Sequence, residues 1–226
     1  MTNPQQAVWN RLEAIFEKRY PVLFASLSPP ASLEQLDAFE EASRLSLPAD
    51  VRDSYLLHDG CKRTLGPNEE ELPSLFCGYR WASLHDMLDW WTATSETEPF
   101  NPEVDCVYSF TEAEDPGGWG ACAVRPWDYI FPRCWFPIGQ LADDRFGAWF
   151  IDTLPGPKGH EGQLVHKLTG GSSLVAASSL TEYLHALADG LEKGEIEHSQ
   201  GKGRWPRWMW RYKDSGRGFL SPQYGW

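Results

Sequence analysis

The stretch that decides the fold runs from Trp149 to Leu168 and reads WFIDTLPGPKGHEGQLVHKL. Gly156, Gly159 and Gly162 follow one another at a spacing of three, and Lys158 stands between the first two. Such a stretch can be a phosphate-binding loop, or it can connect two strands. The choice decides whether nucleotide chemistry is a possible function of this protein.

A phosphate-binding loop needs the pattern G-x-x-x-x-G-K-[ST] between a strand and a helix, because the helix N-terminus and consecutive backbone N–H groups bind the anion together. Here Lys158 precedes a glycine, and the residues after Gly162 have strand character. The dinucleotide-binding spacing G-x-G-x-x-G is not present in this stretch either. We therefore favour a connection between strands, in which glycine supplies backbone freedom and proline supplies stiffness.

Three short β-type runs surround this connection and are separated by turn residues: AWFID (148–152), GQLVHKL (162–168) and SSLVAAS (172–178). Their simplest arrangement is an antiparallel meander. Ser179 and Glu182 then have the spacing of a helix N-terminal cap, and Gly194 is placed to end that helix. The apolar face of the helix is expected at Leu180, Tyr183, Leu184, Leu187 and Leu191.

The N-terminal part predicts three helices. Asn3 with Gln6, and Ser32 with Gln35, have capping-box spacing, and Pro48 suits the start of a third helix that Gly60 would end. The first helix ends near Tyr20–Pro21, and the second and third meet at Leu47–Pro48. Helical spacing is shown by Val8, Leu12, Ile15, Phe16 and Arg19, by Leu33, Leu36, Phe39 and Ala42, and by Val51, Tyr55 and Leu56.

The middle of the chain is less regular. SLFCGYRW (74–81) predicts a strand, Ser83 with Asp86 predicts the start of a helix through LHDMLDWW, and CWFPIG (134–139) resumes strand character. Residues 92–132 are interpreted as an insertion with at most two strands. Helices, then strands, then a helix predict an α+β fold.

Composition limits the class of protein. The 226 residues contain 42% hydrophobic residues and 12 tryptophans, which suits one large globular domain with or without extensions. No run is long and apolar enough to span a membrane, and the N-terminus lacks a signal peptide pattern, so we expect a cytoplasmic protein. An odd number of widely spaced cysteines without a C-x-x-C pair predicts buried free thiols at Cys61, Cys77, Cys106, Cys122 and Cys134.

Charge is distributed unevenly along the chain. From His198 onward there are six basic residues and one acidic residue, a net charge of +5. Since the whole chain carries −12, residues 1–197 carry −17. An acidic body repels nucleic acid and attracts basic surfaces. The tail interleaves its basic residues with aromatic ones and could stack on bases, lie at a membrane interface or pack on the body. We favour packing, because a tethered partner has a high effective concentration.

Candidate catalytic groups give only a weak pattern. Cys134 with His166, or Ser173 with His166 and Asp152, could form a nucleophile and base, but a chain with five cysteines and six histidines offers such pairs by chance. Cys134 beside a tryptophan suits the core, and His166 in an alternating strand suits the surface. We predict no catalytic residues.

Candidate metal ligands occur only as adjacent pairs, and neighbours in sequence do not face one site on a helix or strand. We therefore predict no metal site and no cofactor. The pairs are His58–Asp59, His85–Asp86 and His160–Glu161.

Together these segments resemble the SUKH superfamily, which includes a fungal cell-wall assembly regulator and many bacterial immunity proteins. The similarity spans about Ser32 to Glu195 and rests on SLEQLDAFEEASRLSLPADVRDSYLLHDG, on LFCGYRWASLHDMLDWW, and above all on the stretches from WFPIG to LEKGE. The residues that carry the family pattern are Leu47, Pro48, Tyr55, Gly60, Trp135, Pro137, Gly139, Asp152, Pro155, Gly156, Gly159, Gly162 and Gln163.

The resemblance implies an α+β fold with one central, mostly antiparallel sheet packed by helices, and a domain that binds proteins without catalytic apparatus. It divides the chain into an N-terminal helical extension at 1–31, a SUKH-like domain at 32–197 with the insertion at about 92–132, and a basic, tryptophan-rich tail at 198–226. The extension, the insertion and the tail depart from the smaller members of the family.

The leading functional hypothesis is an immunity-type protein that neutralises a bacterial toxin by stoichiometric binding. The expected partner is a protein toxin, such as a basic, nuclease-like one, and no membrane, nucleic acid or small-molecule substrate is expected. Aromatic anchors within a polar rim give such binding its affinity, and acidic residues would steer a basic toxin. We predict anchors at Trp119, Trp127 and Tyr129, and steering by Glu69, Glu70, Glu71, Glu112, Glu114 and Asp115.

Two alternatives remain open. The first is a regulatory interaction module, related to the cell-wall assembly regulator and working without a toxin partner. The second is an enzyme of unrecognised type. A neighbouring gene for a secreted toxin domain would favour immunity over the regulatory module.

Overall fold

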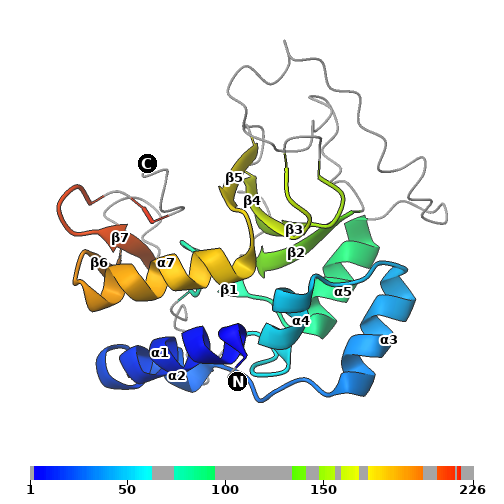
Figure 1. The fold of residues 1–226 in the computed structure, drawn as a ribbon, viewed down its shortest axis with the longest axis horizontal. Coiled ribbons are helices and arrows are strands. Elements are labelled where there is room, and N and C mark those ends of the chain that lie inside the picture. Colours follow the sequence, from blue (N-terminus) through cyan, green and yellow to red (C-terminus); the bar gives the residue numbers. More distant parts are fainter. Residues whose placement is uncertain are drawn as a thin grey trace, which may run out of the picture.

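The computed structural model describes residues 3–62, 74–94, 134–140, 148–155, 159–167, 173–200, 208–216 and 218–219. Figure 1 shows a central sheet beside helices α3, α4 and α5, and a second group formed by α1, α2, α7, β6 and β7. The expected mixture of helices with an antiparallel sheet is confirmed. Most of the insertion expected at 92–132 lies outside the described residues.

The central sheet has five antiparallel strands in the order β1-β2-β3-β4-β5, which is the order of the chain. The antiparallel meander predicted around the glycine-rich connection is therefore confirmed. The strands are β1 (Arg80–Trp81), β2 (Trp135–Gln140), β3 (Ala148–Asp152), β4 (Gln163–Lys167) and β5 (Ser173–Ala177).

Strand β1 is much shorter than the strand predicted at 74–81. The backbone turns at Gly78, which has φ +78°, and Phe76 and Tyr79 exchange backbone hydrogen bonds across that turn. Only Arg80 and Trp81 remain to pair with β2. The apolar content of this segment serves core packing, and this is why it imitates a strand.

Six helices are described: α1 (Pro4–Arg19), α2 (Pro21–Ser26), α3 (Leu33–Ser43), α4 (Ala49–Tyr55), α5 (Leu84–Thr94) and α7 (Leu180–Glu192). The short helix α2 was not predicted. It begins at Pro21 directly after α1, where a proline at the first helical position is well tolerated. The predicted helix start at Pro48 is confirmed, but α3 already ends at Ser43, so residues 44–48 separate the two helices that were expected to meet at Leu47–Pro48.

Helix caps follow the sequence closely but not completely. Ser32 and Gln35 form the predicted capping box, and Ser179 accepts a hydrogen bond from the Glu182 backbone N–H. Asn3 caps α1 through the Gln5 backbone N–H, whereas Gln6 donates to Asn10 and completes no capping box. The capping box predicted at the N-terminus is therefore wrong, because the Gln6 side chain hydrogen-bonds to Asn10, one turn further along α1.

The buried face of α3 also differs from the prediction. Leu36, Phe39 and Ser43 point into the core, while Leu33 is 55% exposed and Ala42 is exposed. Leu33 is the first helical residue, and α3 packs against α5 on a narrow stripe. Helical periodicity therefore predicted the helix correctly but wrongly included Leu33 and Ala42 in its buried face.

Strands β3 and β4 are buried on both faces. Trp149 and Ile151 join the large core that contains α7 residues such as Tyr183, whereas Phe150 packs with Trp135 and Val165 in a second cluster on the opposite face. Because both faces are covered, these strands are nearly continuous apolar runs. The sheet is thus a scaffold between two apolar layers.

The C-terminal part packs back on the body, as predicted for the tail. Strand β6 (Ile196–Gln200) pairs with β7 (Trp208–Tyr212) in a separate two-stranded antiparallel sheet, so β7 is not an added edge of the central sheet. Trp210 is fully buried and stacks on Phe16 of α1. The contact made here is apolar burial, whereas charge attraction was expected. The domain limit predicted at 198 falls inside β6.

Candidate functional site

The glycine-rich stretch joins β3 to β4 through a shaped turn. The Gly162 backbone N–H donates to the Asp152 carbonyl at 2.7 Å, and the Gln163 N–H donates to the His160 carbonyl at 2.9 Å. Gly162 has φ +83°, a backbone conformation that residues other than glycine rarely adopt. Pro155 and Gly159 lie in the same connection, while Gly156 and Lys158 lie outside the described residues.

Two buried polar side chains hold the ends of this hairpin together. Gln163 Nε2 donates to Asp152 Oδ2 at 2.8 Å, and Asp152 Oδ1 accepts from the Leu154 backbone N–H at 3.0 Å. Gln163 Oε1 accepts from the His160 N–H at 3.2 Å. Asp152 is fully buried and Gln163 is 1% exposed, so these hydrogen bonds stabilise polar groups that would otherwise be costly to bury.

The hairpin rests on the junction between α3 and α4. A Cβ on Gly162 would lie 2.9 Å from Pro48 Cβ, so only glycine allows this approach. Glu40 of α3 accepts from the Leu47 backbone N–H at 2.7 Å and pairs with Arg52 of α4 at 2.6 Å. The family residues from two distant segments, Leu47–Pro48 and Gly162, therefore meet at one structural contact.

The remaining described family residues also lie in the fold's interior. Tyr55 is fully buried, its hydroxyl donates to the Ala82 carbonyl at 2.8 Å, and burial raises its pKa well above the usual value. Gly60 has φ +70° and touches the Ala82–Ser83 backbone. Gly60 does not end α4 as predicted, because α4 stops at Tyr55. Trp135, Pro137 and Gly139 are buried residues of β2.

The candidate nucleophile Cys134 and the candidate base His166 are not brought together. Cys134 is buried in the cluster that contains Phe150, as expected for a core thiol, whereas His166 contacts Trp149 on the opposite face of the sheet. The strand register pairs Ser173 with Lys167. Cys134 and His166 therefore do not form a nucleophile–base pair.

The prediction that His166 lies on the surface is wrong. The side chain is 5% exposed, its Nε2 lies 3.4 Å from the Tyr79 hydroxyl, and burial lowers its pKa from 6.5 to about 4. Alternation along β4 could not reveal this, because both faces of the strand are covered.

Acid should therefore destabilise the fold through His166. The unfolded chain takes up a proton near pH 6.5, the folded chain only near pH 4, so the contribution of His166 is present above pH 6.5 and is lost as the pH falls to about 4. The loss amounts to about 3 kcal/mol. In urea unfolding measured across this range, His166→Gln should show a shallower pH dependence than wild type, and exposed His160→Gln should not. Equal slopes for all three proteins would contradict the assignment.

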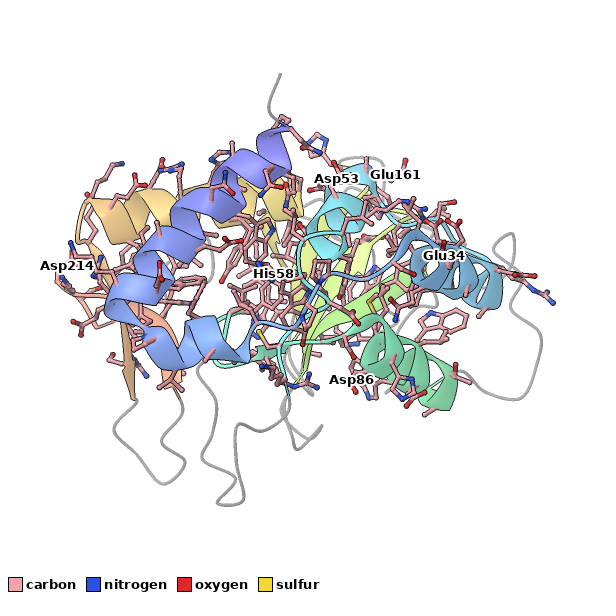
Figure 2. All side chains as sticks on the ribbon, turned by 90° about the horizontal axis from the view of Figure 1, so that it is seen from below. Glu34, Asp53, His58, Asp86, Glu161 and Asp214 are labelled. Atoms are coloured by element: carbon pink, nitrogen blue, oxygen red, sulfur yellow. The ribbon has the colours of Figure 1, made fainter. Side chains whose placement is uncertain are left out.

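In two of the candidate metal pairs, His58–Asp59 and His85–Asp86, the two side chains have different partners. His58 points to Glu13 while Asp59 accepts from the Leu84 backbone N–H, and Asp86 pairs with Arg80 at 2.9 Å (Figure 2). His85 pairs instead with Asp89 along α5. Among the described residues, no group of three His, Cys, Asp or Glu side chains is placed to hold a metal ion.

The predicted partner-binding residues all lie outside the described ranges, so their role stays a prediction: Trp119, Trp127, Tyr129, Glu69, Glu70, Glu71, Glu112, Glu114 and Asp115. Among the described acidic residues, Figure 2 labels Glu34 in the first turn of α3, Asp53 of α4 and Glu161 of the β3–β4 connection. Leu33 and Leu154 are exposed apolar residues, at 55% and 42%.

Within the described ranges, no helix is both long enough and apolar enough to cross a membrane.

Comparison with known proteins identifies the family. The family model described as SMI1/KNR4 (SUKH-1) matches residues 30–186. Similar proteins include KNR4/SMI1 homolog 2 of Debaryomyces hansenii, 27% identical over 86% of this chain and 36% of that protein, and the cell wall biosynthesis/cell cycle regulator smi1 of Schizosaccharomyces pombe, 26% identical over 93% and 42%. The glucan synthesis regulatory protein of Neurospora crassa is 24% identical over 82% and 38%. This chain thus spans about two fifths of the length of these relatives, and it belongs to the SMI1/KNR4 family.

Proposed function

We propose that this protein is a regulatory protein-interaction module of the SMI1/KNR4 type, which controls another protein by binding it. The observation that carries the proposal is the match to this family over residues 30–186, together with relatives that are named as regulators of the cell wall, the cell cycle and glucan synthesis. Those names describe the relatives, which are longer proteins. Which process this chain regulates depends on which protein it binds.

The geometry of the family residues supports a scaffold role. The Asp152 and Gln163 side chains hydrogen-bond to each other inside the fold, and Gly162 and Pro48 form a packing contact. These residues maintain the shape of the domain and leave binding to its surface. In this proposal the predicted anchors Trp119, Trp127 and Tyr129 supply the contact.

Toxin immunity, the leading hypothesis from the sequence, becomes the second candidate. It shares direct protein binding with the regulatory proposal, but the regulators among the relatives favour the latter. We place the activity in the cytoplasm, because Cys61 and Cys77 are free buried thiols, which suits a reducing compartment.

The test begins with affinity purification from the source cells, using the wild-type chain as bait beside a Trp119→Ala/Trp127→Ala/Tyr129→Ala variant. Proteins enriched only by the wild type are then purified and mixed with it. We expect one of them to form a saturable complex of fixed stoichiometry that survives gel filtration, and to change its own activity when bound.

A matched control replaces exposed Leu33 and Leu154 by alanine, which alters apolar surface elsewhere. Binding lost in the triple variant and kept in the control would support the predicted anchors. A partner that kills cells, and whose lethality this chain suppresses, would support immunity instead. Failure of every enriched protein to form a saturable complex would overturn the proposal.

A further inference from the structure

Helix α2 has an outward side without polar side chains. Its sequence is PVLFAS, and its one polar side chain, Ser26, is buried and donates to the Leu23 carbonyl at 2.7 Å. Leu23 is buried as well. The other four residues are exposed and form what we call the α2 surface: Pro21, Val22, Phe24 and Ala25. A helix that is apolar all round is normally buried on all sides, so the exposure of α2 requires an explanation.

The exposed leucine of α3 is different, because polar residues stand beside it. Leu33 is 55% exposed, and its neighbours Ser32 and Glu34 are exposed too. Single apolar residues among polar ones are common on protein surfaces and need no binding partner. Val22 and Phe24, at 52% and 37%, belong instead to a continuous apolar surface, and such surfaces often mark interaction sites.

Three exposed basic residues lie next to the α2 surface. Lys62 donates from Nζ to the Ala25 carbonyl at 3.0 Å, so it lies at the C-terminal end of α2. Lys18 and Arg19 occupy the last turn of α1, directly before α2. The exposed acidic residue beside them is Glu17, so three positive charges and one negative charge give a local net charge of +2. The whole chain, in contrast, carries −12.

We propose that the α2 surface is a docking site for a protein segment whose apolar side chains are flanked by carboxylates. The apolar side chains cover Val22 and Phe24, and the carboxylates pair with Lys18 and Lys62. This inference rests on the proposed function, in which the chain works by binding another protein. It adds a surface that precedes the family match at 30–186 and is formed by other residues than the predicted anchors.

An anionic membrane would also attract basic and apolar residues, but the charge of the chain favours a protein. At −12, the whole chain is repelled by anionic lipids. Surfaces that recognise such lipids usually gather about four to eight basic residues, more than the three beside α2. A protein segment can place its carboxylates at Lys18 and Lys62 alone, without bringing negative charge against the rest of the chain.

Photo-crosslinking identifies what covers the α2 surface. p-Benzoylphenylalanine replaces Phe24 in the full chain and, as a matched control, Leu33, which is also exposed. Irradiation in the source cells should join position 24, but not position 33, to one other protein. Sequencing of the joined peptide should show apolar residues next to Asp or Glu. The proposal is overturned by a crosslink to lipid or to a second copy of this chain, by a joined segment without acidic residues, or by equal crosslinking at both positions.

A synthetic peptide with the sequence of the joined segment then measures the affinity by fluorescence anisotropy. Val22→Ser/Phe24→Ser should bind it at least about tenfold more weakly than the wild type. Lys18→Glu, which keeps the apolar residues, should bind it about fivefold more weakly at low salt, and the difference should shrink as salt is added. The control Leu33→Ser/Leu154→Ser should bind like the wild type. Equal affinity for all four proteins would contradict the proposal.

Failure of this inference differs from failure of the proposed function. If the partner found by affinity purification binds Val22→Ser/Phe24→Ser as tightly as the wild type, the α2 surface is not used, while the regulatory function stands. If no protein forms a saturable complex with the wild type, the proposed function fails and this inference fails with it. Circular dichroism of both serine variants should match the wild type, because the substituted side chains are exposed.

Discussion

Trp210→Ala should destabilise the protein by about 4 kcal/mol, because it removes a large, fully buried side chain and leaves a cavity. The indole stacks on Phe16 at 5.9 Å between ring centroids and meets Tyr20 edge-on at 5.2 Å. Its Nε1–H donates to the Leu75 carbonyl at 2.9 Å, so alanine also removes the shorter of two hydrogen bonds that this carbonyl accepts, the other coming from the Tyr183 hydroxyl at 3.4 Å. Urea unfolding followed by circular dichroism measures the loss.

Lys213→Ala is the matched control, since Lys213 follows β7 directly and is exposed. It should change stability by less than about 0.5 kcal/mol. The contrast decides whether the C-terminal ribbon is an integral part of the fold or an appended tail. A Trp210→Ala protein as stable as the Lys213→Ala protein would show that the ribbon contributes nothing to the core.

Gly60→Ala should cost about 4 kcal/mol, from two effects that act together. The backbone at Gly60 has φ +70°, and an added Cβ would lie 2.6 Å from the Ala82 carbonyl carbon and oxygen. The clash is with backbone atoms, so no change of side-chain rotamer can relieve it. The segment that carries His58 would have to move away from the segment between β1 and α5. Thermal and urea unfolding measure the change.

Gly216→Ala separates the two effects. Gly216 has φ +67°, but a Cβ there would meet nothing within 4 Å, so only the conformational cost of about 1 kcal/mol remains. The difference between the two variants gives the cost of the steric clash. Equal destabilisation by both would mean that the approach of Gly60 to Ala82 is not tight.

Helix starts and strand order were predictable because they depend on neighbours in sequence. The capping box at Ser32 and Gln35 is formed by groups three residues apart, and the meander from β3 to β5 follows from short runs separated by turn residues. Local pattern failed where a tertiary contact competes, as at Gly60, which serves a close approach to Ala82 instead of a helix end.

For the candidate site, the resemblance identified the residues, and the structure explains them. Asp152 and Gln163 stand eleven positions apart, and their spacing gave no sign that they would form a buried pair. The contact of Gly162 with Pro48 joins segments more than a hundred residues apart. The sequence pattern had no signal for the His58–Glu13 pair, because its members belong to different elements.

By itself the sequence determined the family, the α+β class, the antiparallel meander and most helix boundaries. Only the tertiary structure decided which residues are buried: His166 is in the core, Leu33 is exposed, and Trp210 joins the C-terminal ribbon to α1. The physical reason is that hydrogen bonds within a turn or a cap depend on nearby residues, whereas burial depends on which surfaces meet after the chain has folded. The same reason explains why the glycine-rich stretch, which first suggested phosphate binding, serves as the support of the β3–β4 hairpin on the α3–α4 junction.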